Sequence, residues 1–159
     1  MNIFVLDYEP SEAARLHLDK HIVKMPLETA QILSTVQHQF GNQAQYKPTH
    51  ANHPCTIWAR RSKENYEWLV ELGLELCAEY SYRYGKRHAC QSVIESIWTP
   101  PQAIGVGLTA FAQAMPDECK HPDAVTAYRN YYRLHKAHIA SWTHRNVPEW
   151  MEELNEQIA

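Results

Sequence analysis

The chain has 159 residues, the length of one ordinary domain, and 45% of them are hydrophobic, 21% charged and 11% aromatic. Its formal net charge of −3 excludes a polycation, so any DNA-binding face must be a local basic patch that acidic residues elsewhere offset. No apolar run approaches the ~18 residues of a membrane span and no charged-then-apolar leader opens the chain, so we expect a cytoplasmic protein with no membrane partner.

Helices account for most of the predicted elements. Five glycines against nine prolines, with few alternating β-branched runs, favour helices over a sheet. MNIFVLD, residues 1–7, opens the chain as a short strand or extended segment. Helical spacing then runs from Ser11 to about Phe40. Pro26 lies inside this helix and should kink or restart it, because proline removes a backbone hydrogen bond and crowds the preceding turn.

The rest of the chain continues in helical segments. A loop over 41–54 leads to a helical pattern over 55–84, which should break near the capping residue Ser62 and end at Gly85. A short helix, a proline-rich connection, a strong helix and an acidic helix follow, over 86–98, 99–122, 122–142 and 148–159. The sequence shows no internal repeat and no shift in composition. We therefore predict a single compact all-α domain over 1–159 with a short extended N-terminal segment.

A narrow polar stripe runs along the first predicted helix. At 100° per residue its four members fall within about 40° of one another, and apolar residues flank them on both sides. These members are His17, His21, Lys24 and Glu28. Such a helix should be buried on both flanks, with the stripe facing a cleft or an internal polar network.

Two interpretations of the stripe stay open at this point. Lys24 and Glu28 can form a structural pair at i, i+4, worth a few tenths of a kcal/mol. Alternatively the stripe is functional, with Glu28 as acid/base and His17, His21 and Lys24 lining a substrate pocket. A metal site in the stripe is disfavoured because lysine is not a usual metal ligand.

Basic and aromatic residues alternate over 80–88 and 128–136, and 59–63 adds three cations. Cations can contact phosphates while tyrosines stack on bases, so these segments are candidate contacts for DNA or a nucleotide. The structural alternative is that the tyrosines pack the core while the cations reach outward. The candidate substrate-binding residues are Arg60, Arg61, Arg83, Tyr84, Lys86, Arg129 and Tyr132.

Motifs for metals and cofactors are weak or missing. Three cysteines have a histidine two residues away, as in the pairs His53–Cys55, His88–Cys90 and Cys119–His121. Thiolate and imidazole suit zinc, but the CxxC and HExxH spacings are absent, so we predict free thiols and no metal. There is also no GxxxxGK[ST], GxGxxG or GxSxG, so we expect no cofactor.

One stretch carries a family resemblance. LDKHIVKMPLETAQILSTV, residues 18–36, resembles the first long helix of the bacteriophage pyrimidine-dimer DNA glycosylases of the endonuclease V type. On that register His21 matches a family histidine and Glu28 matches the family's catalytic glutamate. Residues 52–80 and 128–139 resemble the second helical segment and the tyrosine-rich C-terminal part more weakly. The whole chain is also similar to phage proteins that begin with MNIFVLD, which indicates a host-cell cytoplasm as its location.

The resemblance implies an all-α DNA-repair enzyme that combines glycosylase and abasic-site lyase activity. In that family the N-terminal α-amine attacks C1′ of the damaged nucleotide and forms an imine, while the glutamate manages protons and charge. The matching groups here are the amine of Met1 and the carboxylate of Glu28. An α-amine has an ordinary pKa near ~7.7–8.0, against ~10.4 for lysine, so far more of it is a neutral nucleophile at pH 7.

Three features depart from the family pattern. The bulk of Asn2 should leave Met1 in place, whereas the family exposes a small residue at its mature N-terminus. Leu27 and Gln31 stand near Glu28, where the family glutamate is flanked by arginines, and the family is basic whereas this chain is not. Two alternatives therefore remain: an enzyme acting on a free, modified nucleotide or nucleoside with the same pocket, and a non-catalytic nucleotide- or nucleic-acid-binding protein.

Overall fold

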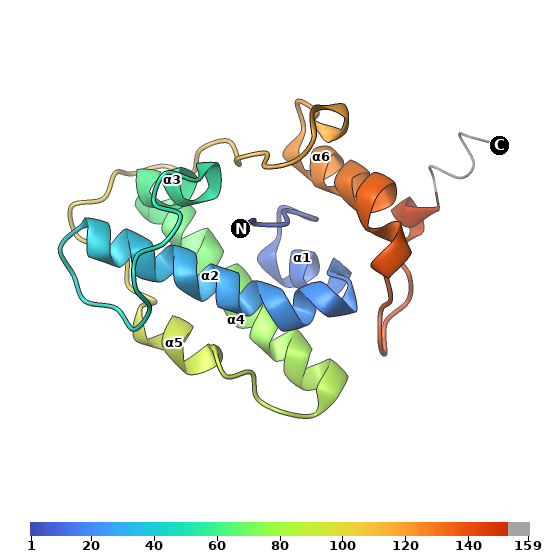
Figure 1. Ribbon diagram of the computed structural model, residues 1–159, viewed down its shortest axis with the longest axis horizontal. Coiled ribbons are helices and arrows are strands. Elements are labelled where there is room, and N and C mark those ends of the chain that lie inside the picture. The colour runs from blue at the N-terminus through green and yellow to red at the C-terminus, as the bar shows by residue number, and fades with distance from the viewer. Residues whose placement is uncertain (153–159) are drawn as a thin grey trace.

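Two long helices, α2 (Asp19–Gln39) and α4 (Lys63–Tyr84), pack along each other in the computed structural model, which describes residues 1–152 (Figure 1). Three shorter helices pack against this pair: α1 (Pro10–Leu16) against α4, and both α3 (Pro54–Arg61) and α5 (Gln91–Ser96) against α2 and α4. Residues 1–152 contain no strand, so the predicted all-α class is confirmed. None of the helices in this range is long and apolar enough to cross a membrane.

Local capping signals determine where α4 begins and ends. The hydroxyl of Ser62 accepts a hydrogen bond from the backbone N–H of Asn65 at 3.0 Å and satisfies a donor of the first turn. At the other end Gly85 adopts a left-handed conformation with a φ of 69°, which glycine tolerates best. The predicted break near Ser62 and the predicted end at Gly85 are both confirmed.

The first predicted helix is divided elsewhere than expected. The chain becomes extended at His17 and Leu18, between α1 and α2, and α2 then continues through Pro26 without restarting. Of the two predicted effects of Pro26, a kink or a restart, the restart is therefore wrong. Proline there removes the bond to the carbonyl of Ile22, a loss of about 3 kcal/mol in an isolated helix. Burial of α2 along most of its length offsets that loss.

The strong helix predicted over 122–142 is shorter and changes its winding. It comprises α6 (Ala124–Tyr131), then a π-helical turn η2 (Tyr132–Lys136) and a 3-10 turn η3 (Ala137–Ile139). A π turn admits an extra residue and rotates the side chains that follow it relative to an α-helix. The sequence pattern therefore predicted the element but not the direction of its last side chains.

Three other predictions for the second half have different outcomes. The helix expected over 86–98 covers only Gln91–Ser96, because the left-handed Gly85 turns the chain away first. The connection over 99–122 contains only the short 3-10 turn η1 (Asp117–Cys119), so its irregular character is confirmed. Of the acidic helix expected over 148–159, the 3-10 turn η4 (Glu149–Met151) is present, and residues beyond 152 lie outside the described part.

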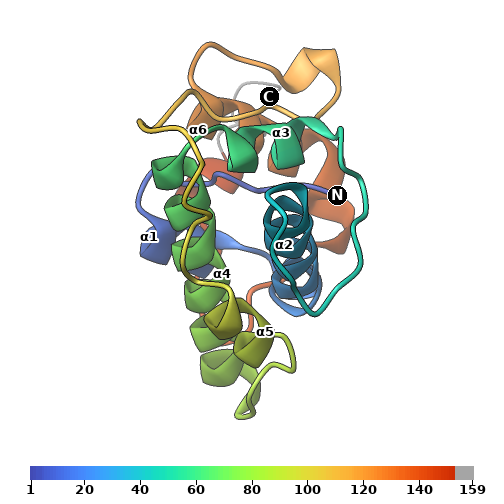
Figure 2. The same ribbon diagram turned by 90° about the vertical axis from the view of Figure 1, so that its left-hand side faces the viewer.

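The N-terminal segment forms part of the core. Ile3, Phe4, Val5 and Leu6 are all buried, and they belong to the same hydrophobic cluster as the inner faces of α2 and α4. Figures 1 and 2 both show this segment running inside the molecule, between α2 and α3. The chain start is thereby held in the interior, next to the middle of α2. The four cysteines are free, as predicted, and all four are buried.

Candidate active site

A small pocket of about 130 Å³ opens where the N-terminal segment, α2 and the C-terminal helical run meet. Its walls combine charged, aromatic and sulfur-containing side chains from parts of the chain that are far apart in sequence. The residues that line it are Met1, Asn2, Phe4, His21, Lys24, Met25, Glu28, Tyr131 and Lys136. Tertiary packing alone brings residues 1 and 136 to the same pocket.

Glu28 is the acidic group of this pocket and is 7% exposed. Its Oε1 lies 3.2 Å from the α-amine of Met1 and accepts a hydrogen bond from the backbone N–H of Asn2 at 3.0 Å. Its Oε2 lies 3.6 Å from Nζ of Lys24, one helical turn away on α2. Both carboxylate oxygens therefore contact donors, and two of these donors, the α-amine of Met1 and Nζ of Lys24, are primary amines.

The α-amine of Met1 faces the pocket because the rest of the residue is held in the core. The Met1 side chain is only 3% exposed, whereas the residue as a whole is half-buried. The exposed part of Met1 is therefore its backbone end, which carries the amine. A nucleophile at this position is anchored by its own side chain and lies within reach of a carboxylate.

His21 lies beside this pair with a defined hydrogen-bonding state. Its ring stacks on Phe4 with centroids 4.2 Å apart, and its Nδ1 lies 2.7 Å from the hydroxyl of Tyr132. That hydroxyl accepts the backbone N–H of Leu18 at 3.3 Å, and because it is buried its own proton needs an acceptor, which Nδ1 provides. The Nε2 of His21 then carries the ring proton and is a hydrogen-bond donor.

Burial, together with the nearby charges of Lys136 and Lys24, lowers the pKa of His21 to about 2. The ring is therefore neutral at physiological pH. A neutral imidazole donates a hydrogen bond from Nε2 but carries no charge that would compete with the amine of Met1 for Glu28.

Positive charge gathers at the rim of the pocket despite the net charge of −3. Lys24 is 69% exposed, and Lys136 of η2 lies with its Nζ 5.0 Å from the centre of the Tyr131 ring. With the amine of Met1, three basic groups surround the single carboxylate of Glu28. This local excess of positive charge suits an anionic substrate such as a phosphodiester.

Comparison with known families agrees with this geometry. A family model described as pyrimidine dimer DNA glycosylase matches residues 1–92, more than half of the chain. The chain belongs to the pyrimidine dimer DNA glycosylase family. It is thereby placed among DNA glycosylases, whose substrate is DNA. Searches of curated proteins and of solved structures gave no match. The matched range contains Met1, His21, Lys24 and Glu28, while Tyr131 and Lys136 lie beyond it.

In this glycosylase two residues predicted to bind substrate are enclosed in the core instead. His17 is 0% exposed and its Nδ1 donates to the carbonyl of Ala13 at 2.6 Å. Burial lowers the pKa of His17 to about 4, so its ring is also neutral. Tyr132 is fully buried behind His21. Neither side chain reaches the pocket surface, because the extended residues between α1 and α2 and the packing of η2 turn them inward.

Arg83 is a third residue predicted to bind substrate that the fold encloses. Its guanidinium is buried and bonded to Glu79 at 2.8 Å and to Asp19 at 2.9 Å. Arg145 joins the same cluster through Glu79 at 2.9 Å. A buried and fully paired arginine holds α4, α2 and the C-terminal segment together and is closed to a phosphate.

The other basic and aromatic candidates lie away from the pocket. Arg60 donates to the carbonyl of Ala51 at 2.6 Å, and Arg129 donates to the carbonyl of Leu6 at 3.0 Å. Arg61, Tyr84 and Lys86 are exposed and are not among the residues that line the pocket around Glu28. Their contact with DNA stays a prediction. The sequence signal over 128–136 pointed to the right segment, but Tyr131 and Lys136 line the pocket, while Arg129 and Tyr132 do not.

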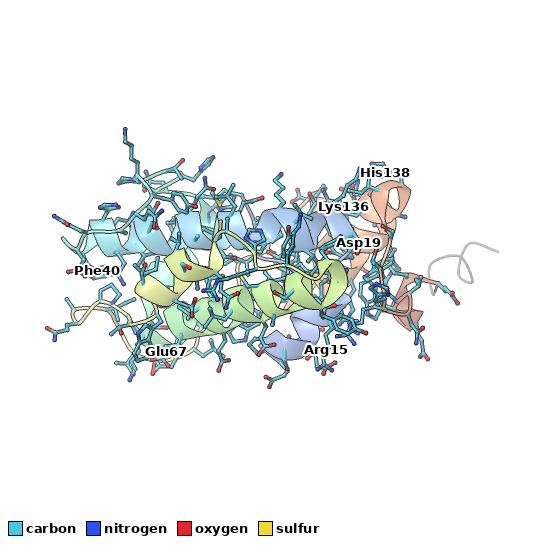
Figure 3. The ribbon with its side chains drawn as sticks, turned by 90° about the horizontal axis from the view of Figure 1, so that it is seen from below. Arg15, Asp19, Phe40, Glu67, Lys136 and His138 are labelled. Atoms are coloured by element: carbon cyan, nitrogen blue, oxygen red, sulfur yellow. The ribbon has the colours of Figure 1, made fainter. Side chains whose placement is uncertain are left out.

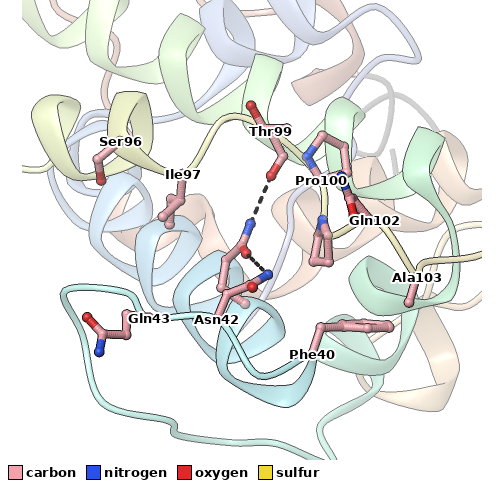
Figure 4. Close-up of a pocket in the computed structure, with 11 residues that line it drawn as sticks. Phe40, Asn42, Gln43, Ser96, Ile97, Thr99, Pro100, Gln102 and Ala103 are labelled. Carbon is pink, nitrogen blue, oxygen red and sulfur yellow. Dashed lines mark hydrogen bonds between the residues drawn. The ribbon is translucent and has the colours of Figure 1, made fainter.

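A larger pocket of about 500 Å³ lies at the other end of α2. Figure 3 shows Phe40 at that end, opposite Asp19 and Lys136. Gln37 there donates to the carbonyl of Thr99 at 2.9 Å and accepts from Asn42 at 2.9 Å, as Figure 4 shows. Among the described residues that line it, no side chain is charged. This larger pocket therefore offers no acid, base or amine for catalysis.

The histidine–cysteine pairs have a structural explanation. Nδ1 of His53 accepts the backbone N–H of Cys55 at 3.1 Å, and Nδ1 of His88 accepts that of Cys90 at 3.0 Å. His121 accepts the N–H of Asp123 at 2.9 Å in the same way. These histidines cap turns by bonding to the backbone two residues ahead, which accounts for the spacing in His53–Cys55 and His88–Cys90 but not in Cys119–His121, where the bond runs away from the cysteine.

Proposed function

We propose that this DNA glycosylase is also an abasic-site lyase, and that it acts on damaged pyrimidines through an imine formed by the α-amine of Met1. The observation that carries the proposal is the 3.2 Å distance between that amine and Oε1 of Glu28 in a pocket rimmed by basic groups. A nucleophile and an acid/base group within one contact distance are what covalent catalysis requires. The competing nucleophile, Lys24, is 69% exposed and well hydrated, which favours Met1.

The proposed steps use the two groups in turn. The lone pair of the Met1 amine attacks C1′, and the bond between C1′ and the base breaks with its electron pair leaving on the base, which takes up a proton. Glu28 accepts the proton that the amine loses and returns it to O4′ as the sugar ring opens to the imine. Glu28, again deprotonated, then takes a proton from C2′, and the electron pair left there, which the imine stabilises, forms the C2′–C3′ double bond as the C3′–O3′ bond breaks and the 3′ phosphate leaves with the bonding pair.

The remaining groups of the pocket fit a substrate that is part of a polymer. Lys24 and Lys136 can contact the phosphates on either side of the reacting sugar, and His21 can donate from Nε2 to a sugar or phosphate oxygen. A pocket of about 130 Å³ holds the volume of about four water molecules. Sites that enclose a free small molecule usually offer about 300–1,000 Å³. The small volume therefore favours a sugar presented by DNA over a free nucleotide.

Borohydride trapping tests the proposal directly. Untagged protein, with its N-terminus checked by intact mass, is mixed with duplexes that carry an abasic site, a pyrimidine dimer or no lesion, and borohydride is then added. We expect a covalent adduct with the lesion-bearing duplexes whose mass maps to Met1. Glu28→Gln should lower the trapping rate at least a hundredfold, in line with loss of a general acid/base.

The matched control is Glu75→Gln, the same change at an exposed position of α4, which should trap DNA at the wild-type rate. An adduct that maps to a lysine would remove Met1 from the mechanism. Complete absence of an adduct and of strand cleavage with every duplex would overturn the lyase proposal. An enzyme that acts on a free nucleotide or nucleoside and a binding-only protein would then be the remaining interpretations.

A further inference from the structure

The second residue of the chain is unusually well anchored for a position next to a terminus. Asn2 is 9% exposed, whereas the first residues of most domains are poorly ordered. Its Nδ2 donates to the carbonyl of Ala114 at 2.9 Å. Its Oδ1 accepts from the hydroxyl of Tyr128 at 3.1 Å, from the N–H of Ile3 at 2.8 Å and from the thiol of Cys55 at 3.7 Å.

These bonds attach one side chain to three separate parts of the fold. Cys55 belongs to α3, Ala114 to the connection over 99–122, and Tyr128 to α6. The backbone N–H of Asn2 adds a fourth attachment, because it donates to Oε1 of Glu28 on α2. The same carboxylate oxygen lies 3.2 Å from the amine of Met1. The position of that amine is therefore determined by the residue that follows it.

We propose that Asn2 is a positioning residue for the reaction, holding the α-amine of Met1 against Glu28 at the only register that allows proton transfer. This inference rests on the proposed function. Consecutive Cα atoms lie about 3.8 Å apart, so a chain start shifted by one residue would take the amine out of contact with Oε1. If the terminus were not anchored, the amine would occupy many positions, and few of them would suit attack on C1′.

The test compares two substitutions whose side chains are bulky enough to keep Met1 on the chain. Asn2→Asp keeps the shape of the side chain but replaces the donor to Ala114 and adds a negative charge beside the amine. Asn2→Leu removes every side-chain hydrogen bond. Asn146→Asp, at an exposed position, is the matched control. The charged and titratable groups that face the amine stay the same in all of them: His21, Lys24, Glu28, His53, Cys55 and Lys136.

Trapping by borohydride on an abasic duplex is measured from pH 6 to pH 9. We expect Asn2→Asp to trap about tenfold more slowly at pH 7 and to recover toward pH 9, because an added negative charge favours the protonated amine. Asn2→Leu should be slower at least tenfold across the whole range, since its amine is misplaced at every pH. Asn146→Asp should follow the wild type.

A second measurement keeps this inference separate from the proposed function. The rate at which a small acylating reagent labels the Met1 amine is recorded against pH without DNA, and folding is checked by circular dichroism and thermal unfolding. If the wild type forms no adduct with any DNA, the lyase proposal fails, but the labelling profiles still decide the role of Asn2. Labelling profiles of both variants that overlay the wild-type profile would overturn the positioning role of Asn2. If the variants lose stability but label like the wild type, Asn2 is a structural anchor only.

Discussion

Two histidines of the predicted polar stripe, His17 and His21, are buried and neutral. Tyr132 fixes the tautomer of His21, and the carbonyl of Ala13 fixes that of His17. Both rings are therefore neutral side chains whose protons sit at known atoms. Of the two, His21 lines the pocket and His17 supports the core. Helical spacing places both histidines on the same predicted stripe, but only His21 lines the pocket.

Acid should destabilise this fold through these two rings. Burial lowers the pKa of His17 to about 4 and of His21 to about 2, against 6.5 in the unfolded chain. Between these values the unfolded chain binds more protons, so stability is complete above pH 6.5 and falls as the pH drops. We expect the unfolding free energy of the protein, measured by urea denaturation, to fall on the order of 2–3 kcal/mol per histidine between pH 7.5 and pH 4.5.

Replacement of His17 isolates its share of this pH dependence. The difference in unfolding free energy between pH 7.5 and pH 4.5 should be smaller in His17→Gln by about 2–3 kcal/mol, whatever its stability at neutral pH. His138→Gln, at an exposed position, should leave that difference unchanged. Equal differences in His17→Gln and the wild type would mean that His17 titrates normally in the folded state.

At the scale of elements, the closeness of α2 and α4 depends on a glycine. A Cβ added at Gly73 of α4 would lie 2.8 Å from Cγ2 of Thr29 on α2 and 3.0 Å from Cδ1 of Ile94. Thr29 is buried, and its branched side chain has little freedom to move aside. Thr29 also follows Glu28 directly, so a shift of α2 at this contact would move the carboxylate of the site.

Gly73→Ala should therefore destabilise the protein although alanine favours helices. Overpacking costs about 1–3 kcal/mol, while the gain in helix propensity is about 1 kcal/mol, which leaves a net loss of up to about 2 kcal/mol. Adding Thr29→Ser removes the clashing Cγ2 and should restore most of the loss in urea denaturation. A double variant no more stable than Gly73→Ala would show that the close approach of α2 and α4 does not limit stability.

Local signals made some elements predictable and long-range packing made others not. Ser62 and Gly85 act on their own neighbours within a few residues, so a single sequence is enough to place the ends of α4. The extended break at His17 and the π turn at Tyr132 depend on partners more than 100 residues away, such as the bond from Leu18 to Tyr132. No pattern in the adjacent sequence reports such a partner.

The candidate site divides in the same way. Glu28 and Met1 were predictable because a family resemblance covers the helix that carries the glutamate, and the structure brings the two together. Asn2, Phe4 and Lys136 entered the pocket through the tertiary fold, without a spacing that would indicate them. Resemblance to a family therefore identified the chemical groups, and the fold was needed to identify what holds them.

For the molecule as a whole, the question is how a chain with a net charge of −3 can act on DNA. Charges on a protein surface are screened over about 8–10 Å at physiological salt, so acidic groups at a distance do not cancel a local basic rim. Figure 3 shows Glu67 and Lys136 at opposite ends of the molecule. The pocket rim of Lys24, Lys136 and the amine of Met1 should therefore determine the response of binding to salt.

The slope of log affinity against log salt for an abasic duplex measures how many phosphates the basic groups of that rim contact. Each phosphate contact contributes about −0.9, so two lysines and an amine predict a slope of about −2 to −3, far shallower than for a basic DNA-binding domain. Lys24→Ala and Lys136→Ala should each make the slope shallower by about 0.9. Lys120→Ala, at an exposed lysine paired with Asp117 at 3.1 Å, should leave it unchanged. If all three substitutions change the slope equally, DNA responds to the overall charge of the protein, and the pocket rim is not where the phosphates bind.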